Sequence, residues 1–331
     1  MNYKRKISTS YTEANSYIKG LYNPTISNIE ADNAFLDILS NTSINTHVDR
    51  ISFHCSSEIK EPEKRLFRAL KDHGYSCKED NLVEHGNFKR RGLYTHREKN
   101  IKIAVFYQHK DSCPPYIPDL RIIVDDPDII SIHWLDTICN SFGFTTTLSY
   151  VELSIDFSPF SDFLKDYLCR NLVLKYYRGT SRKEYESFYI GNKHKNSKSL
   201  IIYCKKIVGD ILRLELRFNR YFLKSAGVEL NCLEKVNSID LSNIISFKHL
   251  NREKLINHLI WRHKSMLSMP YQDDRELIRQ LRELSNISNI VTDQIHYMKK
   301  QTDINNSNRF FEDIPEANLA FYERLKNARY I

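Results

Sequence analysis

Acidic and basic residues alternate with apolar ones along two segments, TLSYVELSIDF (147–157) and ILRLELRFNR (211–220). Successive side chains of a β-strand point to opposite faces, so residues two apart share a face. If both segments are strands that lie side by side, their polar faces bring together Glu152, Asp156, Arg213, Glu215 and Arg217. Carboxylate oxygens are the ligands that Mg²⁺ and Mn²⁺ prefer, and such an ion can polarise a phosphodiester. The three carboxylates therefore predict a divalent metal site.

A third strand-like segment, SLIIYCKK (199–206), places Tyr203 and Lys205 on one face. A tyrosine hydroxyl beside a bound phosphate can attack phosphorus and form a covalent intermediate. The ammonium group of a nearby lysine favours the phenolate and can also hold the phosphate. The same alternation is typical of the solvated face of any antiparallel sheet, where Glu215 between two arginines would simply form ion pairs. The pattern alone leaves both interpretations open.

Two further features are candidates for the same chemistry. Tyr189, in FYIG (188–191), is a second possible nucleophile, although an aromatic residue before glycine at a strand end is more typical of packing. A basic loop follows it, and its side chains either contact DNA phosphates or form a solvated hairpin tip: Lys193, His194, Lys195 and Lys198. Arg217 is a further candidate for contact with DNA.

The elements that must position these residues occur in a repeated order. Apolar periodicity predicts βαβββα over 48–143 and βαββββ over 146–220. We expect an α+β fold with a large, mostly antiparallel sheet built from two related halves with flanking helices, followed by a helical C-terminal region. The predicted divisions are a polar leader at 1–45, a sheet domain at 46–225 and the helical region at 226–331. Helices at 273–286 and 287–301 form either a helix-turn-helix or a bundle on the sheet.

Composition restricts the class of protein. The 331 residues carry a formal net charge of +8, which suits a partner made of phosphates. The seven cysteines include no CxxC pair and are odd in number, which indicates reduced thiols. The first residues, MNYKRKISTSYTEANS, contain no apolar segment, and no window has the length and apolarity of a membrane span. We therefore expect a cytoplasmic protein.

The ordered set YVELSIDF, FYIG–NKHKNSKS–LIIYCKK and LRLELRFNR resembles the replication initiators of staphylococcal-type rolling-circle plasmids, the Rep_trans group, and the related relaxases of integrative conjugative elements. In that family a strand ending in Tyr-x-Lys carries the catalytic tyrosine. The resemblance implies that Tyr203 is the nucleophile and that Glu152, Asp156 and Glu215 bind Mg²⁺ or Mn²⁺. This sequence departs from the family pattern at Glu152, where an aspartate is expected, and at Cys204, where a polar residue is usual.

The resemblance implies that 46–225 is a DNA-nicking domain, with Lys205 and Arg213 also catalytic. Such an enzyme cuts one strand at an origin, stays joined to the 5′ end through a phosphotyrosine, and initiates rolling-circle replication of a plasmid or phage. It also implies a homodimer and a host helicase as partner. The alternatives are a conjugative relaxase and a non-catalytic DNA-binding regulator on the same fold. None of the twelve histidines forms a His-x-His pair, which disfavours the other large class of rolling-circle nickases.

Overall fold

The structure, a computed structural model, describes residues 28–83, 86–111, 118–175, 181–184, 186–191, 197–205, 211–228, 233–250 and 311–326. Its centre is a ten-stranded antiparallel sheet with the order β2-β3-β4-β5-β1-β6-β11-β10-β9-β8. The predicted α+β class with a large antiparallel sheet is therefore confirmed. Among the described residues, no helix is both long enough and apolar enough to span a membrane.

The first half of the sheet runs from residue 43 to residue 141. Its elements are β1 (Ser43–Ser56), α3 (Pro62–Asp72), β2 (Tyr75–Leu82), β3 (Phe88–His96), β4 (Lys102–His109), β5 (Leu120–Asp125) and α4 (Ile129–Ser141). The carboxylate of Asp128 accepts a hydrogen bond from the Ser131 backbone N–H at 2.7 Å. Asp128 is thus the N-terminal cap of α4.

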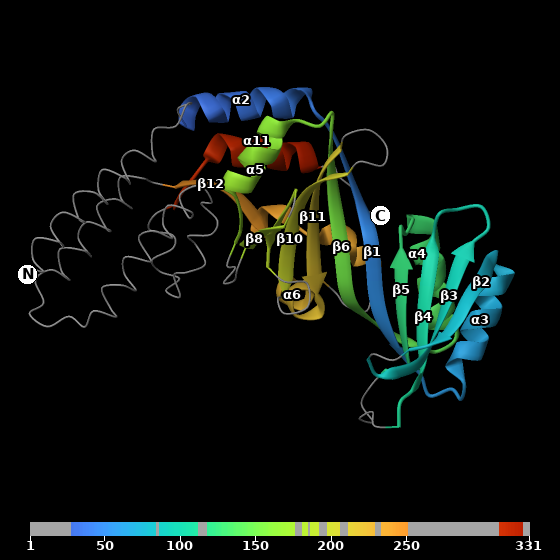
Figure 1. Cartoon of the computed structure of the whole chain (residues 1–331). Helices are drawn as coiled ribbons and strands as arrows, with labels where there is room; N and C mark the ends of the chain where they lie inside the picture. Colours follow the sequence, from blue (N-terminus) through green and yellow to red (C-terminus); the bar gives the residue numbers. More distant parts are fainter. Residues whose placement is uncertain are drawn as a thin grey trace, which may run out of the picture.

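The second half repeats this order with changes. Its elements are β6 (Thr145–Ser158), α5 (Asp162–Asn171), β7 (Leu172–Leu174), β8 (Ser181–Glu184), β9 (Ser187–Ile190), β10 (Lys198–Lys205), β11 (Ile211–Asn219) and α6 (Arg220–Ser225). In each half the first strand pairs with the last one, β1 with β5 and β6 with β11, and the two first strands pair with each other. Figure 1 shows the result, in which the long strands β1 and β6 join two groups of shorter strands. This arrangement confirms the two related halves.

One face of the sheet is apolar because the alternate residues of its strands are leucine, isoleucine, valine and phenylalanine. Helices pack on this face through side chains that are almost fully buried, including Leu66 and Leu70 of α3, Ile132 and Leu135 of α4, and Leu164 and Leu168 of α5. The opposite, polar face of the sheet carries the charged positions of β6 and β11. Burial on the apolar face therefore fixes which side chains reach the polar face.

The predicted leader at 1–45 requires a correction for its described part. Residues Asn28–Asn41 form helix α2, and β1 already begins at Ser43. Phe35 is fully buried and stacks on the Tyr167 ring of α5, with ring centroids 4.2 Å apart. Its neighbours Ile38 and Leu39 follow at helical spacing, a signal that the polar composition of the segment obscured. Residues 1–27 lie outside the described part.

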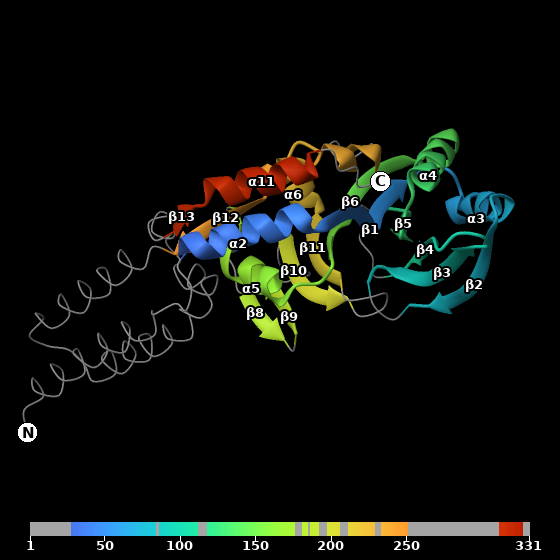
Figure 2. The same cartoon turned by 90° about the horizontal axis from the view of Figure 1, so that it is seen from above.

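The predicted boundary near residue 226 does not separate two units. The segment beyond it contains two 3₁₀ turns, η1 (Leu233–Ser238) and η2 (Leu241–Asn243), followed by β12 (Ile245–Leu250), β13 (Phe311–Asp313) and α11 (Pro315–Leu325). Strand β12 pairs with β7 of the second half, and Phe321 of α11 is fully buried in the common core. Figure 2 shows α2 and α11 lying side by side. The helices predicted at 273–286 and 287–301 fall outside the described residues.

Candidate active site

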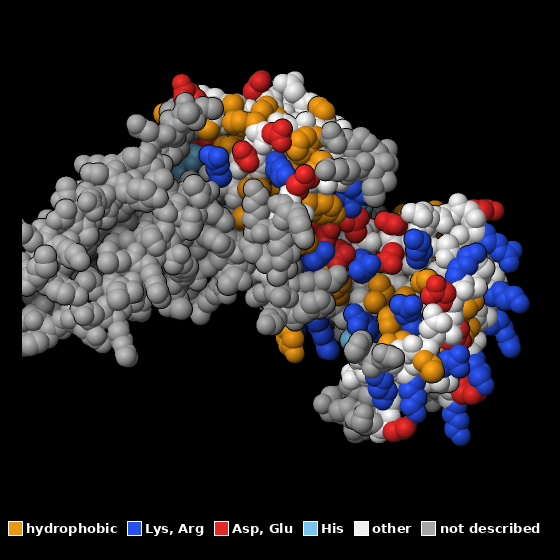
Figure 3. All heavy atoms as spheres, in the orientation of Figure 1, with side chains coloured by type: hydrophobic (Ala, Val, Ile, Leu, Met, Phe, Trp, Pro, Cys, Tyr) orange, Lys and Arg blue, Asp and Glu red, His pale blue; other side chains and the backbone are white. Residues whose placement is uncertain are grey.

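The register of β6 and β11 places the predicted charged residues on one face. Asp156 pairs with Arg213, Ser154 with Glu215, and Glu152 with Arg217. On the other side of β11, Tyr203 of β10 lies directly opposite Arg213. Figure 3 shows acidic and basic side chains gathered side by side over β11, β6 and β1. The strand parity expected from the sequence therefore brings the carboxylates, the arginines and Tyr203 together.

Asp49 of β1 is a member of this cluster that sequence reasoning missed. Strict alternation would place it on the apolar face with Ile51 and Phe53. The register between β1 and β6 shifts between Val48 and Arg50, so Asp49 is the extra residue of a β-bulge. A bulge re-aims side chains locally, and here it turns Asp49 onto the polar face. The available signal was the run HVDRISF, in which charged residues interrupt the alternation.

Arg213 is held by two aspartates. Its Nε and Nη2 donate to Asp156 at 2.6 and 2.7 Å, and its Nη1 donates to Asp49 at 2.8 and 3.0 Å. Burial would lower the pKa of the Arg213 guanidinium, but these carboxylates raise it above its ordinary value. Burial would likewise raise the pKa of Asp49, but hydrogen bonds from His47 and Ser154 and the charge of Arg213 lower it to about 2. The two carboxylates therefore hold the Arg213 guanidinium in a fixed position.

Arg217 connects two glutamates of the same face. Its Nε donates to Glu215 at 2.5 Å and lies 3.4 Å from a Glu152 oxygen. The Glu152 carboxylate also accepts a hydrogen bond of 2.5 Å from the Tyr150 hydroxyl. Arg217, predicted to contact DNA, thus makes ion pairs within the cluster.

Tyr203 donates a hydrogen bond from its hydroxyl to Oε2 of Glu215, at 3.2 Å. Burial and the negative charge of Glu215 raise the pKa of Tyr203, against the opposing effect of Arg213. Burial also raises the pKa of Glu215, although Arg217 opposes this shift. Burial and Glu215 therefore favour the protonated phenol in the free protein, and the role expected for Lys205 stays a prediction. The phenol is protonated, and a carboxylate with raised proton affinity accepts its hydrogen bond.

Tyr189, the alternative nucleophile, lies farther from the carboxylates. It pairs with Ile201 of β10, and β9 is separated from β11 by the whole of β10. Ile201 in turn pairs with Glu215, so all three residues lie on the polar face. Adjacent strands are about 4.8 Å apart, which puts Tyr189 roughly two strand spacings from β11. Tyr203 is the tyrosine next to Glu215.

The predicted DNA-binding loop is only partly described. Lys193, His194 and Lys195 lie outside the described residues. The prediction for Lys198 is wrong. Its side chain points to the apolar face, where it is buried and donates to the Lys175 carbonyl oxygen. Its ammonium lies 5.0 Å from the centre of the Phe222 ring, and burial lowers its pKa to about 8. Lys198 is therefore not placed to contact phosphate.

In this arrangement the predicted metal ligands are paired with arginines. Glu152 and Glu215 are paired with Arg217, and Asp156 is paired with Arg213. Within the described ranges, no three His, Cys, Asp or Glu side chains are grouped so that they could hold a metal ion. A cation could bind among these carboxylates only if an arginine moved.

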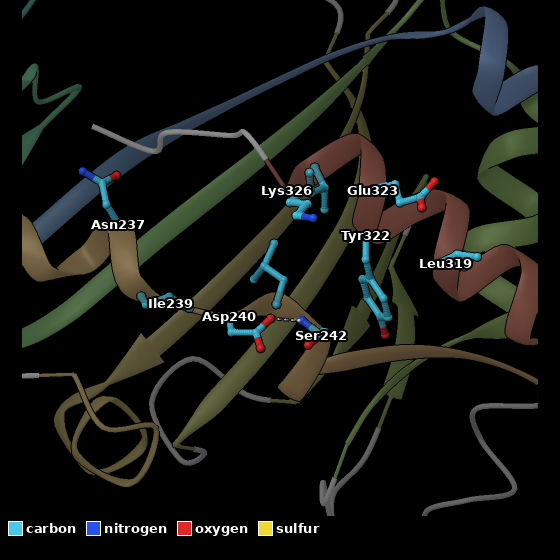
Figure 4. A pocket seen from close by; sticks show the side chains of 10 residues that line it. Asn237, Ile239, Asp240, Ser242, Leu319, Tyr322, Glu323 and Lys326 are labelled. Atoms are coloured by element: carbon cyan, nitrogen blue, oxygen red, sulfur yellow. Dashed lines mark hydrogen bonds between the residues drawn. The ribbon is translucent and has the colours of Figure 1, made fainter.

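A separate cavity of 490 Å³ lies between the η1–η2 segment and α11. Figure 4 shows Tyr322 and Lys326 on one side of it and Ile239 and Asp240 on the other. Asp240 accepts a hydrogen bond of 2.9 Å from the Ser242 backbone N–H, as the cap of η2. The cavity contains none of the polar-face residues. The cavity is therefore separate from the candidate active site.

No protein-family model matches the chain, and no curated protein matches its sequence. Among solved structures, one that is similar is described as the structure of a rolling-circle replication initiator protein from Geobacillus stearothermophilus. The two share 12% sequence identity with a TM-score of 0.38, over 67% of this chain and 97% of that one. A likeness this distant does not establish a shared activity.

Proposed function

We propose that this chain nicks and rejoins one strand of DNA through a covalent phosphotyrosine, as an initiator of rolling-circle replication. The observation that carries the proposal is the Tyr203 hydroxyl bonded to Glu215 at 3.2 Å, beside an arginine fixed by two aspartates. Nucleophile, proton acceptor and fixed positive charge are the parts that a phosphoryl transfer requires. The sequence resemblance supports the same reaction.

The reaction proceeds by exchange of one phosphodiester for another. The Tyr203 oxygen forms a bond to phosphorus while its proton passes to Glu215, whose raised pKa makes it a better acceptor than an ordinary glutamate. The bond between phosphorus and the 3′ oxygen breaks, and that oxygen takes a proton from solvent. The 5′ end remains on the tyrosine. Rejoining is the reverse, with Glu215 returning its proton to Tyr203.

Arg213 contributes by position. Arg213 pairs with Tyr203 in the β10–β11 register, and its contacts with Asp49 and Asp156 hold the guanidinium within electrostatic reach of the phenol. There it opposes the rise in the Tyr203 pKa that burial and Glu215 cause. It therefore favours the negative charge that develops on the phenol oxygen during attack.

The requirement for Mg²⁺ or Mn²⁺ remains part of the proposal. Four carboxylates of the described cluster face two buried or half-buried guanidinium groups: Asp49, Glu152, Asp156 and Glu215 against Arg213 and Arg217. This excess of negative charge opposes the approach of a phosphate, so a divalent cation entering with DNA would assist binding. Dimer formation and recruitment of a host helicase remain predictions from the resemblance.

Relaxation of supercoiled plasmid tests the proposal. Purified protein with Mn²⁺ should convert a plasmid that carries its own origin to nicked and relaxed circles, whereas a plasmid lacking the origin should stay supercoiled. Addition of EDTA should stop the conversion. If the protein binds the origin but leaves both plasmids supercoiled, it is the non-catalytic regulator and the proposed chemistry is wrong.

A further inference from the structure

The polar face continues from the candidate site onto the first half of the sheet, where its charges change. Arg50 and His54 of β1 and Arg121 of β5 lie there, and Arg220 follows the last residue of β11. We call these four residues the basic face. Arg50 is paired with Asp125 at 2.5 Å. Among the described residues, no carboxylate lies within ion-pair distance of Arg121 or Arg220. Arg121 and Arg220 thus carry positive charge with no described carboxylate beside them.

The basic groups of this face are near enough to affect one another's protonation. Arg121 pairs with His54 in the β1–β5 register. Burial, followed by the positive charges of Arg121 and Arg220, lowers the pKa of His54 to about 4. Burial and the charge of Arg50 also lower the pKa of Arg121. Neighbouring cations repel one another in the free protein. An anion that binds between them reduces this repulsion, which favours binding.

The basic face is continuous with the proposed active site. Arg121 donates to the Ser52 hydroxyl at 3.3 Å, and Ser52 pairs with Tyr150 in the β1–β6 register. The Tyr150 hydroxyl donates to Glu152, which lies beside Arg217. A chain of contacts thus runs across the sheet from Arg121 to the carboxylates that surround Tyr203. A strand whose phosphate lies at Tyr203 can therefore extend over the basic face.

Apolar and aromatic side chains are interleaved with these cations. Arg121 lies over the Phe106 ring of β4, 5.9 Å from its centre, and Phe106 is partly exposed. The neighbouring outward residue of β5, Ile123, is also partly exposed. Duplex DNA presents mainly phosphates to a flat protein surface, whereas single strands also present unpaired bases that stack on aromatic rings. The combination favours a single strand.

We propose that the basic face binds single-stranded DNA next to the scissile phosphate, with Arg121 and Arg220 contacting phosphates and Phe106 contacting a base. This inference rests on the proposed nicking function for the position of the strand, but binding does not require cleavage. The proposed binding surface and the proposed nicking function can therefore be disproved independently of each other.

The test compares two double variants with the same change in charge. Arg121→Gln/Arg220→Gln removes two cations of the basic face, whereas Arg65→Gln/Arg68→Gln removes two exposed ones from α3. Fluorescence anisotropy measures binding of a labelled, mixed-sequence oligonucleotide of about 15 nucleotides and of its duplex, without divalent cations. Thermal unfolding of every variant checks the fold, and Arg220→Gln alone is a second variant at an exposed position.

For the basic-face variant, we expect at least about tenfold weaker binding of the single strand at low salt. The slope of log affinity against log salt should decrease by about 1.4, because each phosphate contact on a single strand contributes about 0.7. The α3 variant should bind as the wild type does. Equal effects of both double variants, a loss confined to duplex DNA, or no single-strand binding by the wild type would each overturn the inference. A protein that nicks DNA yet shows one of these results keeps its proposed function.

Discussion

The two halves of the sheet share one strand order but differ in how the charges on their polar face are paired. On the second half, Arg213 lies between Asp49 and Asp156, and Arg217 lies between Glu152 and Glu215. On the first half, Arg121 has a serine hydroxyl and an aromatic ring as its described partners. Paired charges hold side chains in fixed positions, as a reaction requires. Unpaired cations keep their capacity to attract an anion.

The halves also differ in how their apolar face is covered. Helices α3 and α4, which cover the first half, belong to its own sequence. The second half also buries α2 and α11, which come from outside the repeated unit. The reactive half is thus supported by segments that precede and follow the repeat.

Glu215→Gln should lower the rate of nicking by about 100-fold or more, because glutamine cannot accept the Tyr203 proton. The pKa of Glu215 is raised, so in the wild type the base is lost as pH falls through a value above that of an ordinary glutamate. The rate should therefore fall at the acid end of the pH profile, and the variant should lack that fall. Glu98→Gln, the same substitution at an exposed position of the first half, is the control. A variant that keeps the wild-type rate and profile excludes Glu215 as the base.

Phe35→Ala should destabilise the protein by about 3–5 kcal/mol, since a fully buried ring is replaced by a cavity. Chemical denaturation measures the free energy of unfolding. Exposed Ile29, at the start of the same helix, gives the matched control Ile29→Ala, with little change expected. If both variants unfold like the wild type, α2 is not an integral part of the second half.

Asp49→Asn should cost about 2 kcal/mol of stability near neutral pH, which corresponds to the lowering of the Asp49 pKa from 3.8 to about 2. The contribution of a carboxylate with a lowered pKa is present above its ordinary pKa and is lost as pH falls through the folded value. The difference between variant and wild type should therefore shrink between about pH 4 and pH 2. A difference that stays constant over this range would show that the charge of Asp49 is not what stabilises the fold.

Strand parity predicted much of the site. The alternation in β6, β10 and β11 correctly placed the glutamates, the arginines and Tyr203 on one face, because burial of the leucines between them leaves no other register. The same parity already assigned Lys198 to the apolar face, since it is one residue out of step with Ser199 and Tyr203. Its basic surroundings in the sequence suggested a DNA contact that the strand does not allow.

Other features could not be obtained from sequence pattern. A β-bulge changes parity by one residue and depends on tertiary packing, so the position of Asp49 was not predictable from alternation. The ion pairs of Arg213 and Arg217 depend on which strands are neighbours. The sequence order β6, β10, β11 gives no indication that β11 lies between the other two. Because β11 lies beside β6, Glu152 and Glu215 are both paired with Arg217 instead of surrounding a common metal-binding point.

The central claim is that Tyr203 is the nucleophile, and capture of the DNA strand tests it most directly. A labelled single-stranded origin oligonucleotide is incubated with wild type, Tyr203→Phe or Tyr189→Phe, and covalent adducts are separated under denaturing conditions and sequenced by mass spectrometry. Phenylalanine keeps the ring and its packing but removes the attacking oxygen. The account predicts an adduct on Tyr203 in the wild type and in Tyr189→Phe, and none in Tyr203→Phe. An adduct that persists in Tyr203→Phe and is absent from Tyr189→Phe would contradict it.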